Sequence, residues 1–84
     1  MSISKRFKED QGRLRKELIF RNFEVAIAYI NTVAQIAEQY NHHPKITNTY
    51  NQVILELWTH DENAITDLDW KLAEAIDALD VNFE

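Results

Sequence analysis

The residues best suited to chemistry gather in one segment, Glu38-Gln39-Tyr40-Asn41-His42-His43-Pro44. Because imidazole titrates near neutral pH, an adjacent histidine pair can both give and accept protons. Glu38 and His42 are four residues apart, a spacing that places two side chains on one face of a helix. We therefore expect Glu38 to orient His42 and to fix the tautomer of its ring.

The chain beyond this segment supplies a third histidine. A residue before proline is pushed toward extended backbone, so we expect Pro44 to end the helix and His43 to leave the helical path. His60 ends an alternating apolar segment, and eight residues separate it from Asp69. Asp69 is also the third position of a capping box that begins at Thr66, which makes its first interpretation structural.

Two chemistries are compatible with three histidines and a glutamate. Proton transfer by imidazole needs no metal. The same side chains could instead bind zinc, but spacing along the sequence does not show that the ligands converge. We expect acid-base chemistry with no metal and no organic cofactor, and zinc is the rival interpretation. Taken alone, a histidine pair after a helix is more commonly a solvated terminus.

The first half of the chain predicts a hairpin followed by a long helix. Residues 7–20 alternate around Gly12, the only glycine, which predicts a hairpin that turns there. Asn22 is a suitable N-cap for a helix that continues to Tyr40. This helix has two apolar stripes, and we expect the first to pack on a sheet and the second to contact another subunit. The first is Phe23, Ile27, Ile30, Ala34 and Ala37, and the second is Val25, Tyr29, Thr32, Val33 and Ile36.

The second half predicts a strand and a further helix. A turn at 51–52 precedes residues 53–60, whose alternation puts Val53, Leu55, Leu57 and Thr59 on the face toward the helices. Residues 66–79 predict a helix with an apolar stripe of Leu68, Leu72, Ala75, Ile76 and Leu79. The expected class is α+β, with helices on one face of an antiparallel sheet and residues 1–84 as one domain.

Composition narrows the functional class. The chain lacks cysteine, which removes disulfides and thiolate sites and favours the cytoplasm. No apolar run approaches the roughly 20 residues of a membrane span. Residues 1–21 carry seven Lys or Arg against three acids, and the remainder carries two against eleven. Without interleaved aromatics or a binding motif, this basic end does not predict nucleic-acid binding.

The spacing of the polar residues resembles a known signature. Glu38, three residues, His42-His43-Pro44, five residues, Tyr50, nine residues, His60, eight residues and Asp69 resemble the motif of the pterin-4a-carbinolamine dehydratases. That family is also known as the dimerisation cofactor of a hepatocyte nuclear factor. The resemblance covers nearly the whole chain.

The resemblance implies a four-stranded antiparallel sheet with two main helices on one face. Since few residues precede Phe7, the family's N-terminal helix is expected to be shortened or absent. Phe7 stands where the family usually has tryptophan, and Ala64 stands where it commonly has glycine. The implied catalytic residues are His42, His43, His60 and Glu38. The implied substrate-binding residues are His43, Pro44 and Phe7, and the implied structural motif residues are Tyr50 and Asp69.

The implied activity is that of a 4a-hydroxytetrahydrobiopterin dehydratase, a lyase of tetrahydrobiopterin recycling that acts by histidine acid-base catalysis. The implied partners are the small pterin substrate and further copies of the chain in a homodimer or homotetramer. The alternative is a catalytically weak family member that serves as a protein-interaction or assembly factor. Neither nucleic acid nor membrane is expected as a partner.

Overall fold

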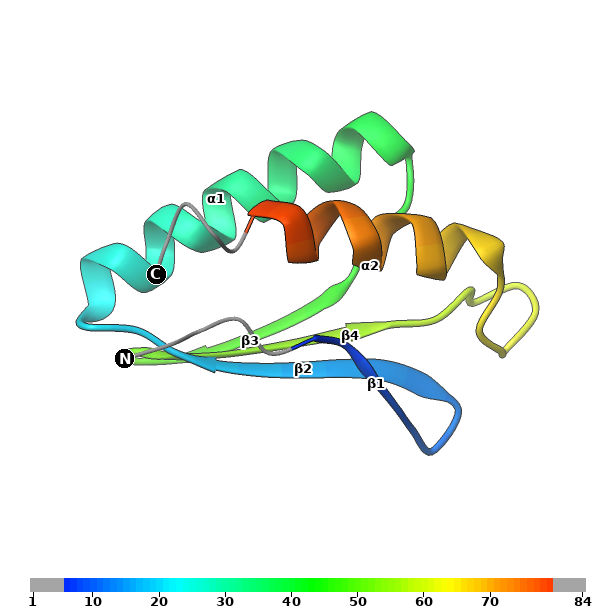
Figure 1. The fold of residues 1–84 in the computed structure, drawn as a ribbon, viewed down its shortest axis with the longest axis horizontal. Coiled ribbons are helices and arrows are strands. Elements are labelled where there is room, and N and C mark those ends of the chain that lie inside the picture. The colour runs from blue at the N-terminus through cyan, green and yellow to red at the C-terminus, as the bar shows by residue number, and fades with distance from the viewer. Residues whose placement is uncertain (1–5, 80–84) are drawn as a thin grey trace.

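Two helices cover one face of a four-stranded antiparallel sheet (Figure 1). In the computed structural model, which describes residues 6–79, the strands are β1 (Lys8–Asp10), β2 (Arg13–Ile19), β3 (Lys45–Thr49) and β4 (Gln52–Leu57). The helices are α1 (Phe23–Tyr40) and α2 (Asp67–Leu79). The strand order is β1-β2-β4-β3. The predicted α+β architecture is confirmed, while the expectation of a shortened N-terminal helix falls on residues 1–5, outside the described residues.

The central strands β2 and β4 supply the floor of the core. Alternate residues on each strand are buried, and the register places Leu14 opposite Leu57 and Leu18 opposite Val53. Alternation of this kind is expected where one sheet face is covered and the other is open. The hairpin turns at Gln11 and Gly12, both with positive φ, which confirms the predicted turn at the glycine.

The turn between β3 and β4 lies one residue earlier than predicted. Tyr50 has a φ of 50°, and Tyr50 and Asn51 connect the strands. Asn51 bonds to the segment between β2 and α1, since its side-chain amide donates to the Phe20 carbonyl at 2.9 Å. The backbone N–H of Phe20 in turn donates to the Asn51 carbonyl at 2.8 Å. These two bonds fix where the chain leaves the sheet to begin α1.

The packing face of α1 is not the one predicted. Its buried residues are Ala26, Tyr29, Val33 and Ala37, so most of the stripe assigned to another subunit lies inside this domain. Phe23, from the stripe assigned to the sheet, is 48% exposed. The small side chains of Ala26 and Ala37 let the helix approach the sheet closely, and the Tyr29 ring packs 4.9 Å from the Phe20 ring.

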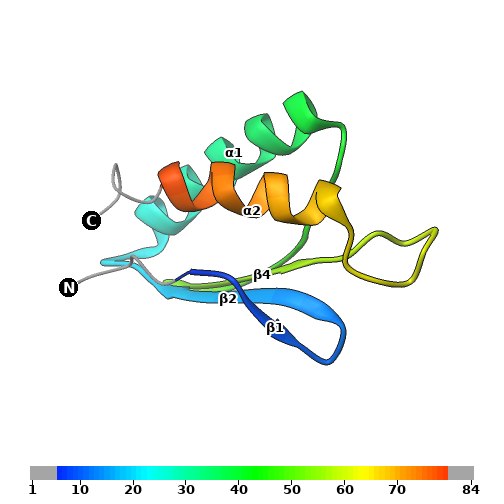
Figure 2. The same cartoon turned by 45° about the vertical axis from the view of Figure 1, so that its right-hand side comes forward.

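Helix α2 lies beside α1 above the sheet in both views (Figure 1, Figure 2). Leu72, Ile76 and Leu79 are buried as the helical spacing predicts, whereas Ala73 is buried in place of the predicted Ala75, which is half-buried. Leu68 was expected in the same stripe, but it is 48% exposed. Within residues 6–79, neither helix combines the length and the hydrophobicity that crossing a membrane requires.

Candidate functional site

The site begins where α1 ends. The last helical residue is Tyr40, and Asn41 adopts the left-handed conformation with φ 51° and ψ 41°. The N–H of Asn41 donates to the Glu38 carbonyl, and the N–H of His42 donates to the Ala37 carbonyl, both at 3.1 Å. This pair of bonds is a Schellman motif, which closes a helix and turns the chain away from its axis. His42 and His43 therefore lie outside the helix.

This helix end overturns the predicted pairing of Glu38 with His42. Glu38 Oε2 lies 2.6 Å from His43 Nε2, and His42 Nε2 lies 2.5 Å from Asp69 Oδ1. The prediction assumed that the helix continued through His42, so that residues four apart would share a face. The left-handed residue at Asn41 breaks that geometry, and each histidine has its own carboxylate.

The two histidine pairs differ in burial. The side chains of His42 and Asp69 are 11% and 0% exposed, whereas those of His43 and Glu38 are 59% and 75% exposed. Water competes with the second pair and screens it, so a pair of that kind is worth about 0–1 kcal/mol. The first pair is sheltered, because the end of α1 and the start of α2 lie at the same end of the helical layer (Figure 1).

Each carboxylate oxygen of Asp69 has a hydrogen-bond partner. Oδ2 accepts the backbone N–H of Thr66 at 2.8 Å, which is the helix-capping bond that the sequence predicts. The same oxygen accepts the Thr59 hydroxyl at 2.9 Å. Oδ1 faces His42. The residue expected to be a structural cap therefore also contacts a histidine of the site.

These contacts assign the tautomer of His42. A carboxylate that accepts from Thr66 and Thr59 is suited to its ionised form, which has no proton to give. His42 Nε2 must then carry the hydrogen of the bond to Oδ1, and Nδ1 is the unprotonated nitrogen of the neutral ring. No described residue forms a hydrogen bond with Nδ1.

His60 belongs to a stack of side chains just past the C-terminal end of β4, the end of the strand that pairs with the start of β3. Its ring lies 4.4 Å from that of Trp58, at an interplanar angle of 23°, and the Arg13 guanidinium carbon lies 4.1 Å from the Trp58 ring centroid. Each contact is a recognised stabilising geometry, aromatic stacking in one case and cation–π in the other. Trp58 is half-buried, with these two side chains against its ring.

The loop that carries His60 is closed by its own hydrogen bonds and extends past the sheet (Figure 2). Thr59 and Ala64 form an isolated antiparallel bridge, and the N–H of Thr59 donates to the Ala64 carbonyl at 2.9 Å. Asn63 takes the positive φ of 50°, so Ala64 needs no glycine-like backbone here. The substitution of alanine at this place is therefore compatible with a well-formed loop.

Of the remaining predicted site residues, Phe7 and Tyr50 lie apart from His42, whereas Pro44 directly follows the histidine pair. Phe7 is buried in the core at 8% exposure, with the Lys16 ammonium 5.4 Å from its ring. Lys16 contacts Asp77, which is eight residues and about 12 Å along α2 from Asp69. Tyr50 is separated from the histidine pair by the five residues of β3, about 16 Å of strand. Pro44, half-buried, connects His43 to β3.

The zinc interpretation gains no support from this arrangement. Among residues 6–79, no three His, Asp or Glu side chains are grouped so that they could hold a metal ion. Instead the polar residues form three clusters: the buried His42 pair, the exposed His43 pair and the His60 stack. The first two clusters lie at the end of α1, and the third follows β4, with His60 directly after Thr59, which donates to Asp69.

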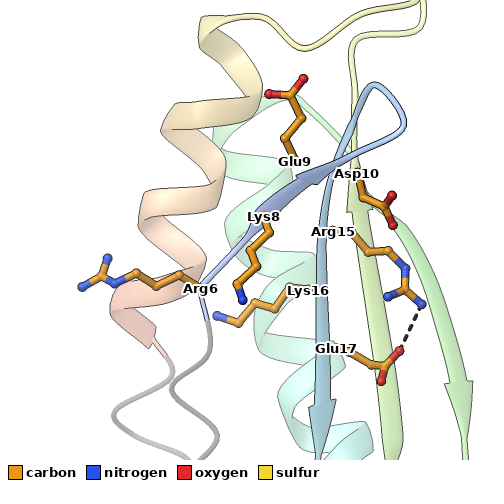
Figure 3. Close-up of a pocket in the computed structure, with 7 residues that line it drawn as sticks. All are labelled: Arg6, Lys8, Glu9, Asp10, Arg15, Lys16 and Glu17. Atoms are coloured by element: carbon orange, nitrogen blue, oxygen red, sulfur yellow. Dashed lines mark hydrogen bonds and ion pairs between the residues drawn. The ribbon is translucent and has the colours of Figure 1, made fainter.

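A cavity of about 540 Å³ lies at the β1–β2 hairpin, away from the histidines. Figure 3 shows that Arg15 and Glu17 point to one side of β2 while Lys16 points to the other, toward α2. Arg15 and Glu17 form an exposed ion pair at 3.0 Å. The cavity is lined by Arg6, Lys8, Glu9, Asp10, Arg15, Lys16 and Glu17. Charges of both signs line it, so its lining selects neither anions nor cations.

Comparison with known proteins decides the family. Residues 3–79 match the family model described as pterin 4 alpha carbinolamine dehydratase. This chain belongs to the pterin carbinolamine dehydratase family. A Prochlorococcus marinus relative named "Putative pterin-4-alpha-carbinolamine dehydratase" is 47% identical over 73 residues, covering 87% of this chain and 76% of its own. A relative of the same name from Metallosphaera sedula is 44% identical over 71 residues, covering 84% and 74%.

Solved structures agree with this assignment. The crystal structure of a transcriptional coactivator/pterin dehydratase from Brucella melitensis superposes with a TM-score of 0.79 at 32% identity, covering 89% of this chain and 80% of that one. A pterin dehydratase-like protein identified as a RuBisCO assembly factor of the alpha-carboxysome superposes with a TM-score of 0.73 at 19% identity, covering 89% of each chain. The second comparison shows the shared fold alone.

Four side chains of this dehydratase-family site were not assigned to it from the sequence, and Thr66 was predicted only as part of a helix cap. They are Thr59, Thr66, Arg13 and Trp58. A signal existed for Thr59, because the alternation of residues 53–60 places it on the face toward the helices, where a hydroxyl must find a partner. None existed for Arg13, which meets Trp58 only through the pairing of β2 with β4.

Proposed function

We propose that this chain is a 4a-hydroxytetrahydrobiopterin dehydratase that acts by histidine acid-base catalysis in tetrahydrobiopterin recycling. The observation that carries the proposal is His42, whose Nε2 is committed to the buried Asp69 while Nδ1 has no partner among the described residues. A fixed imidazole with one available nitrogen is what a general acid or base requires. Family membership supplies the substrate class. We propose the cytoplasm as its compartment.

The reaction needs one proton to arrive and another to leave. The departing hydroxyl on C4a takes a proton and leaves as water when its C–O bond breaks. The lone pair of the adjacent ring nitrogen forms the C=N bond, and a base removes the hydrogen of that nitrogen. We assign His42 Nδ1 as the principal proton carrier and His60 as its counterpart. The product is the quinonoid dihydropterin.

His43 and Glu38 are assigned to substrate binding. Their contact is exposed, so His43 can turn toward a bound ring while Glu38 limits its orientations. Pro44 fixes the backbone after this pair. We retain Phe7 as a proposed contributor to substrate binding through the core that it helps to form, since its ring is buried.

Rates of dehydration of synthetic 4a-hydroxytetrahydropterin test the proposal. We expect acceleration that is unchanged after exhaustive chelation. We also expect His42→Ala to lower kcat by about 10²- to 10⁴-fold, while His43→Ala mainly raises KM. A loss on chelation that zinc restores would support the metal interpretation. If His43→Ala lowers kcat more than His42→Ala does, with both variants folded, the two roles must be exchanged.

A second candidate function is that of a protein-interaction or assembly factor, and the outer face of α1 favours it. Phe23 is 48% exposed, Ala34 is exposed, and Ile27 between them is half-buried. This stripe is apolar, and within the described domain it is not covered by another element. We propose that it joins copies of the chain into a homodimer or homotetramer. Absence of dehydratase activity with and without metal would favour the interaction function.

A further inference from the structure

We infer that the hydroxyls of Thr59 and Thr66 form a relay that positions Asp69 and thereby sets the tautomer of His42. Both are positioning residues, since their hydrogen bonds among the described residues go to Asp69 and to each other rather than to the histidine ring. The effect on rate rests on the proposed dehydratase function, but the effect on the tautomer does not.

The direction of the relay follows from counting protons. Thr59 Oγ1 lies 2.9 Å from Asp69 Oδ2 and 2.7 Å from Thr66 Oγ1. A hydroxyl has one hydrogen, and the carboxylate can only accept. Thr59 therefore donates to Asp69, and Thr66 must donate to Thr59. Hydrogen bonds in a chain polarise one another, and the effect is larger away from water. The Thr66–Thr59 bond should therefore strengthen the bond from Thr59 to Asp69.

The relay joins two elements through one carboxylate. Thr59 comes from the chain just after β4, and Thr66 immediately precedes α2. Together with the Thr66 N–H, the Thr59 hydroxyl holds Oδ2, which leaves Oδ1 as the oxygen that faces His42. Asp69 has no exposed surface, so water cannot replace a missing donor from outside. Removing the Thr59 hydroxyl should let the carboxylate rotate, which would weaken the hydrogen bond between Oδ1 and His42 Nε2.

Thr59→Val is the direct test, because valine keeps the branched shape and lacks the hydroxyl. Thr59→Ser restores the hydroxyl alone. Thr66→Val removes the second donor but keeps the backbone N–H, so its effect should be smaller. Thr47→Val, at an exposed position of β3, is the matched control. Thermal unfolding of all four variants establishes that each is folded before comparison.

The first measurement is the pattern of imidazole ¹H–¹⁵N correlations of His42, recorded where the ring is neutral. We expect wild type, Thr59→Ser and Thr47→Val to show the hydrogen on Nε2, and Thr59→Val to show a mixture of tautomers. A wild-type ring with its hydrogen on Nδ1 would overturn the inference. So would a Thr59→Val spectrum identical to that of Thr47→Val. If Thr59→Val does not fold, the His42 spectrum of Thr66→Val is compared with that of Thr47→Val instead. Identical spectra would then overturn the inference.

The second measurement is dehydratase kinetics. We expect Thr59→Val to lower kcat about 10- to 100-fold, the scale on which partners behind metal-binding histidines act, with KM little changed and with rescue by Thr59→Ser. An equal kcat in Thr59→Val and wild type would overturn the positioning role. If wild type itself is inactive, the proposed function fails, and the tautomer measurement still decides the relay.

Discussion

At the scale of single residues, Asp69 has two tasks that the sequence presents as one. Its third-position spacing after Thr66 is that of a helix cap, and the capping bond is present. The opposite oxygen contacts His42, which spacing along one helix could not indicate. A carboxylate that is both cap and histidine partner links the stability of α2 to the orientation of the ring.

Replacing Asp69 by asparagine should therefore affect rate more than stability. The amide oxygen must still face the Thr66 N–H, so the amide NH₂ would point at His42 Nε2. His42 Nε2 would then have to accept a hydrogen bond from the amide, so the hydrogen of the neutral ring would move to Nδ1. We expect kcat to fall by about 10²- to 10⁴-fold, as for other acids that fix a catalytic histidine.

Glu38→Gln is the control for this substitution. Because the Glu38–His43 pair is exposed, we expect its loss to change kcat less than about fivefold. Steady-state kinetics of the two variants give the comparison. A larger kcat effect from Glu38→Gln than from Asp69→Asn would contradict the assignment of His42 and Asp69.

At the scale of elements, the end of α1 decides how both histidines are presented. Asn41 is the left-handed residue of the Schellman motif, and its backbone directs His42 toward α2 and His43 back toward Glu38. Asparagine tolerates this conformation better than residues with larger apolar side chains. Pro44 then prevents helix from resuming.

Asn41→Ala should destabilise the fold, because a left-handed alanine costs about 1 kcal/mol. Asn41→Gly should be neutral or slightly stabilising, since glycine adopts this conformation without strain. Chemical denaturation measures both changes in the free energy of unfolding. Equal destabilisation by alanine and glycine would mean that the asparagine side chain, rather than its backbone conformation, stabilises this turn.

At the scale of the whole molecule, a charged pair lies between the sheet and α2. Lys16 is buried on the helix-facing side of β2, and its side chain has no exposed surface. Its ammonium lies 2.5 Å from Asp77 Oδ1. Burying such a pair brings little net stability, but removing Asp77 takes a charge partner away from a fully desolvated ammonium.

Asp77→Ala should consequently lower the free energy of unfolding by about 3 kcal/mol. Lys16→Met, which keeps the length and removes the charge, should cost less than Asp77→Ala. Urea denaturation of the two variants tests this order. The reverse order would show that Lys16 contributes through its charge rather than through its packing.

The outer stripe of α1 carries the prediction about assembly. A charge at Ala34, which is exposed, should dissociate a homo-oligomer without unfolding the subunit. A charge at Val33, which is fully buried, should unfold it. Light scattering with circular dichroism distinguishes these results. A wild-type monomer at micromolar concentration would contradict the homo-oligomer.

The sequence by itself determined the class of fold, the hairpin turn at Gly12, the N-cap at Asn22 and the inward face of β4. These depend on local rules, namely residue periodicity and backbone preference, that act within a few positions. The family signature likewise needed only spacing. The catalytic roles of His42, His43, His60 and Glu38 stay a prediction.

The tertiary structure alone decided which stripe of α1 is buried and which carboxylate meets which histidine. Both stripes of α1 are apolar, so periodicity could not choose between them, and the fit of Ala26 and Tyr29 against the sheet did. The partner of His42 depended on one left-handed residue and on a helix 27 positions further along the chain. Pairing over that distance arises from packing, which local sequence rules do not describe.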